Sequence, residues 1–185
     1  MLTEDLSVFT IPLDFSCTIL NDNRLITNIY NIRISADPVE DTAENIGIGF
    51  QRVKHLAEYH LQNSIFLEKD DKLFKELDSL ENNIVCLPCE AYDIYVGSIL
   101  MAKFQAITEK YFDIQHLTIA SLLGDQVQFN IISPYDANLD IEGDHWWNQD
   151  NVYTGSKTAI TWDELNLTEV PKFRPTVVKG GLSEN

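Results

Sequence analysis

The sequence predicts an α+β fold, in which three helices pack on a mostly antiparallel sheet and hairpins lie near both ends of the chain. Alternating apolar segments flanked by turn residues predict the strands, and apolar stripes at helical spacing predict the helices. The chain has 185 residues, of which 44% are hydrophobic. This length and composition suit one domain, which we place at residues 1–170, followed by a loose tail at residues 171–185.

Two pairs of alternating segments predict hairpins. Phe15–Leu20 and Leu25–Ser35 flank Asn21-Asp22-Asn23, which is turn-forming sequence. Gly124-Asp125, with glycine first, is expected to form a two-residue turn between two later strands. These later strands are predicted at residues 116–123 and 126–132. Shorter strands are expected at residues 64–67 and 83–87.

Three segments have helical periodicity: residues 46–61, 69–80 and 91–112. Asp41 and Glu44 resemble a capping box before the first segment. The third segment has the longest apolar stripe, and we expect it to pack on the sheet.

The charge balance is strongly acidic, with 29 acidic against 13 basic residues and a formal net charge of −16. Proteins that bind duplex nucleic acid or a membrane surface need cations facing the phosphates, so neither is an expected direct partner. A strong negative field favours solubility and encounter with basic partners. The three cysteines are too few for a disulfide framework, so we expect a cytoplasmic protein.

Cys86-Leu87-Pro88-Cys89 lies between a predicted strand and the third predicted helix. A helix N-terminus stabilises a thiolate, so Cys86 and Cys89 are candidate redox residues. The adjacent Glu90 and Asp93 oppose this role, because nearby carboxylates disfavour the thiolate. A structural zinc site needs four ligands, and only one cysteine pair is present. We therefore predict no metal site and no cofactor.

No Lys or Arg occurs between Lys110 and Lys157, although seven acidic residues lie in this interval. Adjacent Trp146 and Trp147 within it cannot both be core residues of an ordinary strand. One of them is therefore expected either to be an exposed interface anchor or to cover a pocket. The candidate partner-binding residues are Asp136, Asp140, Glu142, Asp144, Trp146 and Trp147.

Three segments resemble an uncharacterised group of small acidic proteins from large T4-like tailed bacteriophages. They are IVCLPCEAYDIYVGSILMAKFQAITEKYF (residues 84–112), SLLGDQVQFNIISP with the Trp-bearing acidic loop after it, and the WDEL element near the end. The resemblance covers about the C-terminal half and implies a protein made in the cytoplasm of an infected bacterium. It implies no catalytic residues.

The resulting hypothesis is a non-enzymatic interaction protein that binds a basic surface of a host or phage protein, one version being mimicry of nucleic acid. The first alternative is a small enzyme or ligand-binding domain whose pocket lies under the Trp loop and whose chemistry involves Cys86 and Cys89. The second is a structural component of a virion or an assembly complex.

Overall fold

The computed structural model describes residues 9–21, 24–80, 83–137, 139 and 141–165, and its centre is a six-stranded mixed sheet. The strands are β1 (Phe9–Asn21), β2 (Arg24–Pro38), β3 (Ser64–Glu68), β4 (Ile84–Leu87), β5 (Phe112–Ser121) and β6 (Phe129–Ile131). Their order across the sheet is β4-β3-β1-β2-β5-β6. The β1–β2, β2–β5 and β5–β6 pairs are antiparallel, whereas β3 runs parallel to both β1 and β4. The predicted α+β class with a mostly antiparallel sheet is therefore confirmed.

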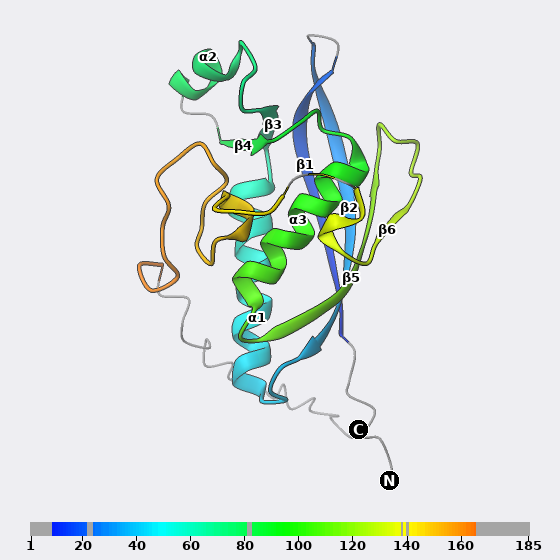
Figure 1. Cartoon of the computed structure of the whole chain (residues 1–185), viewed down its shortest axis with the longest axis vertical. Helices are drawn as coiled ribbons and strands as arrows, with labels where there is room; N and C mark the ends of the chain where they lie inside the picture. Colours follow the sequence, from blue (N-terminus) through cyan, green and yellow to red (C-terminus); the bar gives the residue numbers. More distant parts are fainter. Residues whose placement is uncertain (1–8, 22–23, 81–82, 138, 140, 166–185) are drawn as a thin grey trace, which may run out of the picture.

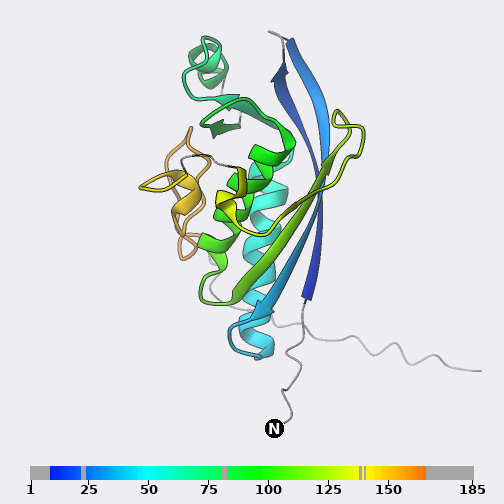
Figure 2. The same cartoon turned by 45° about the vertical axis from the view of Figure 1, so that its right-hand side comes forward.

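Helices α1 (Ala43–Leu56) and α3 (Asp93–Thr108) lie side by side over one face of this sheet (Figures 1 and 2). Helix α1 continues into the π-helical turn η1 (Ala57–Leu61). The short helix α2 (Phe74–Ser79) joins β3 to β4 and lies away from α1 and α3 (Figure 1). No helix among the described residues is long and apolar enough to cross a membrane.

Strand β1 begins earlier than the sequence predicts. The alternation of apolar side chains that we expected to start at Phe15 already includes Ile11 and Leu13, which are buried against the helices. Pro12 lies within this part of the strand, and proline is disfavoured inside most strands. Proline is tolerated in a strand where its missing N–H faces an open edge of the sheet.

Helix α3 lies between the sheet and a further layer of chain, and this further layer was not predicted. Every residue from Val96 to Phe104 is buried, so both its sheet side and its opposite side are covered. The described residues of 134–165, here called the covering segment, lie on the side of α3 away from the sheet (Figure 2).

Three local predictions also need correction. The first helix is capped by Thr42, whose Oγ1 accepts a hydrogen bond from the Asn45 N–H, so the capping box at Asp41 and Glu44 is wrong. The helix expected at residues 69–80 is limited to α2. The prediction of a two-residue turn at Gly124-Asp125 is wrong too. The Gln126 N–H donates a hydrogen bond to the Ser121 carbonyl and closes a longer turn.

Candidate functional site: an aromatic pocket at the ends of β3 and β4

A cavity of about 310 Å³ opens where the parallel strands β3 and β4 end. In open sheets, the carboxyl ends of parallel strands are a common position for ligand sites. We call this cavity the aromatic pocket. Its lining comes from the end of β3 (Glu68, Lys69, Asp70), the end of β4 (Cys86, Leu87, Pro88) and the covering segment (Asp144, His145, Trp146, Trp147, Gln149, Tyr153, Gly155).

The covering segment is fixed to β4 by hydrogen bonds. Cys86 N–H donates to the Thr154 carbonyl at 2.8 Å, and the Thr154 hydroxyl donates to the Ile84 carbonyl at 2.9 Å. Gly155 bridges to β4 with a φ of +94°, a conformation that favours glycine. A Cβ atom there would lie 2.7 Å from Cys86 Cβ, so this close approach also requires glycine.

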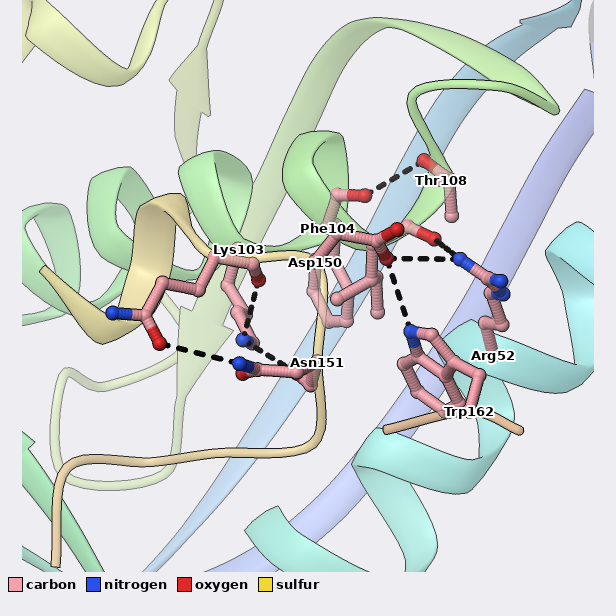
Figure 3. A network of polar contacts seen from close by, with 9 residues as sticks. Arg52, Lys103, Phe104, Thr108, Asp150, Asn151 and Trp162 are labelled. Atoms are coloured by element: carbon pink, nitrogen blue, oxygen red, sulfur yellow. Dashed lines mark hydrogen bonds and ion pairs between the residues drawn. The ribbon is translucent and has the colours of Figure 1, made fainter. Parts of the chain in front are cut away.

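Lys103 of α3 also fixes the covering segment. Its Nζ donates to the backbone carbonyls of Trp146, Gln149 and Asn151 at 2.9, 2.9 and 2.8 Å. Figure 3 shows Lys103 beside Asn151. The side chain is fully buried, and its three ammonium hydrogens match these three acceptors. Burial lowers the pKa of Lys103 to about 7, and the Asp150 carboxylate opposes this shift.

A second polar contact fixes the covering segment to α1. The Arg52 Nη1 atom donates to Asp150 Oδ1 and to the Ile107 carbonyl, both at 2.9 Å. The Trp162 Nε1–H donates to the same Asp150 oxygen at 3.0 Å (Figure 3). The guanidinium also lies over the rings of Tyr111 and Trp162, 4.8 and 5.0 Å from their centroids. These contacts hold one wall of the pocket in place before any ligand binds.

Both tryptophans of the predicted site are buried. Trp146 and Trp147 are 5% and 4% exposed, and they lie in the 3₁₀ turn η3 (Trp146–Asn148). The argument that both could not be core residues assumed a strand, in which neighbouring side chains point to opposite faces. In a 3₁₀ turn they need not do so, and both rings are buried. Their indole N–H groups donate to the Cys86 and Ile141 carbonyls. Both rings line the aromatic pocket, and neither is exposed as an interface anchor would be.

The polar lining of the aromatic pocket is mainly acidic. Glu68 and Asp70 come from the end of β3 and Asp144 from the covering segment, whereas Lys69 is the one lysine or arginine in the lining. Asp144 Oδ1 accepts a hydrogen bond from Gln149 Nε2 at 3.1 Å. His145 stacks on Trp147 with a centroid separation of 4.5 Å. Aromatic rings and carboxylates together favour a positively charged ligand.

Of the other predicted partner-binding residues, Glu142 is described by the structure and does not line the pocket. Glu142 is exposed on the covering segment. Asp140 and the side chain of Asp136 are outside the described residues. Glu68, Asp70 and Tyr153 were missed, because no sequence pattern brings the ends of β3 and β4 next to the Trp loop. Only the presence of two parallel strands in the sheet could have indicated that edge.

The cysteine pair has little thiolate character. Burial raises the pKa of the Cys86 thiol to about 11, with the Lys69 ammonium opposing the shift and Asp78 adding to it. Burial, Glu68 and Glu90 also raise the pKa of Cys89. Protonated thiols are poor nucleophiles, so these raised pKa values disfavour the redox role considered for Cys86 and Cys89. Among the described residues, no group of three His, Cys, Asp or Glu side chains could hold a metal ion.

Comparison with known proteins gave no further guidance. No protein-family model, curated protein or solved structure matched the chain.

Proposed function

We propose that this is a non-enzymatic binding protein that takes a positively charged side chain of a basic protein partner into the aromatic pocket. The observation that carries this proposal is the combination of three carboxylates (Glu68, Asp70, Asp144) with Trp146, Trp147 and Tyr153 around one cavity. A cation there would gain both Coulombic attraction to the carboxylates and attraction to the aromatic rings.

The size of the pocket supports a side chain as ligand rather than a whole folded element. A volume of about 310 Å³ lies at the low end of ligand pockets. An arginine or lysine side chain is long and slender enough to enter such a cavity while the rest of the partner stays outside. The apolar stem of that side chain would contact the rings while its charged end meets the carboxylates.

The rigidity of the pocket also supports binding. The Lys103 and Arg52 contacts fix the segment that carries Trp146, Trp147 and Gln149. A preformed site loses less conformational entropy when the ligand enters, so more of the interaction energy appears as affinity. The net charge of −16 would further speed the approach of a basic partner.

The alternative of an enzyme that uses Cys86 has less support. Its thiol is one of the pocket-lining groups, but the raised pKa leaves it protonated near neutral pH. The Lys69 ammonium lowers the pKa of this thiol but does not offset the effect of burial. A thiol nucleophile would need an adjacent base or a lowered pKa. The remaining alternative, a structural component of a virion, has no specific observation in its favour.

A short fluorescein-labelled oligoarginine peptide tests the proposal by fluorescence anisotropy. The variant Glu68→Gln/Asp70→Asn/Asp144→Asn should bind it roughly tenfold more weakly than the unchanged protein. The matched control is Glu44→Gln/Glu109→Gln/Asp113→Asn, which removes the same charge from exposed positions on α1, β5 and the residue after α3. Equal loss of affinity in both variants would mean that total charge, and not the pocket, determines binding, and the proposal would then fail.

A further inference from the structure

One edge of β1 is partly open. On that side β3 pairs only with Cys17–Ile19. Along Phe9–Ser16, no strand of the described residues pairs with this edge. Strand β2 covers the opposite edge along the whole length of β1. An open strand edge presents backbone N–H and C=O groups that can pair with another extended chain.

The direction of these backbone groups follows from Ser16. Its N–H donates to Gln62 Oε1 at 3.0 Å, and its carbonyl accepts from Asn63 N–H at 2.7 Å, so both groups point away from β2. The β1–β2 register is unbroken from Phe9 to Asn21. Because these directions alternate along a strand, the backbone groups of Thr10, Pro12 and Asp14 point the same way as those of Ser16.

Pro12 fits this arrangement. Its missing N–H removes no hydrogen bond from the β1–β2 pairing, since that position faces the open edge. Between Thr10 and Asp14 the edge therefore offers three carbonyl acceptors but only two N–H donors.

A mostly apolar groove runs beside this edge. It has a volume of about 390 Å³ and lies between β1 and α1. Ile11, Leu13, Phe50 and Ala57 form its apolar lining. In a peptide added to the edge, every second side chain would point toward the helix layer and into this groove.

The charges around the groove favour a basic occupant. Asp14 and Glu58 are acidic, and Lys54 lies 3.5 Å from Glu58 in a salt bridge. Among the described residues Asp14 has no salt-bridge partner. The chain as a whole carries a net charge of −16, so a second copy would be repelled, and Pro12 further weakens pairing of two such edges.

We propose that the open edge of β1 and the groove beside α1 form a docking site for an extended basic peptide segment of a partner, which adds to the sheet as a further strand. Its backbone pairs with Thr10, Pro12 and Asp14, an apolar side chain fills the groove, and basic residues face Asp14. This mode of recognition takes affinity from main-chain hydrogen bonds and specificity from the groove. The site is separate from the aromatic pocket and shares no lining residue with it.

The test uses the full chain and a peptide of alternating lysine and valine. Amide hydrogen exchange, followed by NMR, should slow at Thr10 and Asp14 when the peptide binds. The same slowing in the Glu68→Gln/Asp70→Asn/Asp144→Asn variant would show that this site acts independently of the aromatic pocket. Slowing that disappears in that variant would overturn the assignment to β1.

Two substitutions at the edge change the number of donors in opposite directions. Asp14→Pro removes one outward N–H without breaking the β1–β2 pairing and should weaken peptide binding about two- to tenfold. Pro12→Thr restores a donor and should strengthen binding by a similar factor. Asp14→Asn, which keeps the N–H, is the matched control for the loss of charge at that position.

Three results would overturn the proposal. The first is equal affinity in the Asp14→Pro and Asp14→Asn variants. The second is no gain in affinity on Pro12→Thr, a result that does not depend on whether Asp14→Pro folds. The third is a concentration-dependent dimer that protects Thr10 and Asp14 without peptide, which would make the occupant a second copy of the chain.

Discussion

At the scale of single residues, Lys103 has the most unusual environment. A lysine in the core is normally costly, because its charge loses hydration. Here the backbone carbonyls of Trp146, Gln149 and Asn151 replace water as acceptors. Asp150 is the carboxylate whose charge acts on it, and the nearby His60 is held neutral by burial, which lowers its pKa to about 4. The residue therefore joins α3 to the wall of the aromatic pocket.

Lys103 makes stability depend on pH in a defined direction. Its pKa is about 7 in the folded protein and near its ordinary value of 10.5 in the unfolded chain. Between these values the unfolded chain binds more protons, so the free energy of unfolding should rise as pH increases from about 7. Urea unfolding of the unchanged protein and of Lys103→Met should show this rise only in the former. An identical pH slope in both proteins would contradict the assignment.

Sequence alone did not reveal Lys103. It lies within an apolar helix at a position where a lysine ordinarily reaches solvent, and the groups that bind it are backbone carbonyls of a segment over 40 residues later. Trp146 and Trp147 were found because paired tryptophans in an acidic loop are conspicuous. Their environment was not, since the 3₁₀ turn that buries both has no signature in these residues.

At the scale of elements, α1 contacts the sheet through a close approach at Gly49. A Cβ atom there would lie 2.5 Å from Phe112 Cε2, closer than real Cβ contacts allow. The ring of Phe112 is also in an edge-to-face contact with Phe50, with centroids 5.3 Å apart. This contact leaves the ring little room to move aside.

We predict that Gly49→Ala destabilises the protein by about 1–3 kcal/mol, because overpacking exceeds the gain in helix propensity. The half-buried Gly47 in the same helix is the matched control. Gly47→Ala should be neutral or stabilising by up to about 1 kcal/mol, since alanine favours the helix. Chemical denaturation of both variants measures the difference. Gly49→Ala as stable as Gly47→Ala would show that α1 is less tightly packed than described.

The sequence predicted most elements because their periodicity is local. The alternating side chains of β1 and β2 and the apolar stripes of α1 and α3 depend on neighbouring residues only. The parallel pairing of β3 with β1 and β4, and the layer formed by residues 134–165, depend on contacts between distant parts of the chain. These contacts create the aromatic pocket, so its acidic lining from β3 could not be predicted.

At the scale of the whole molecule, the net charge of −16 acts over a longer range than any single contact. Binding of a basic peptide should weaken as salt rises from about 50 to about 200 mM, because screening shortens the range of the attraction. The Glu68→Gln/Asp70→Asn/Asp144→Asn variant should lose affinity at both salt concentrations, since its loss comes from the pocket. Affinity that is independent of salt would contradict an electrostatic mode of binding.

The central claim is that one cationic side chain enters the aromatic pocket, and NMR of the three indole N–H groups tests it most directly. The probes are acetyl-Gly-Arg-Gly-amide and the same peptide with citrulline, which has nearly the shape of arginine but no charge. Trp146 and Trp147 line the pocket, whereas Trp162 bonds Asp150 and serves as an internal control. We predict that the arginine peptide shifts the Trp146 and Trp147 signals, leaves Trp162 unchanged, and that the citrulline peptide has no effect. Equal shifts with both peptides, or no shift at Trp146 and Trp147, would contradict the account.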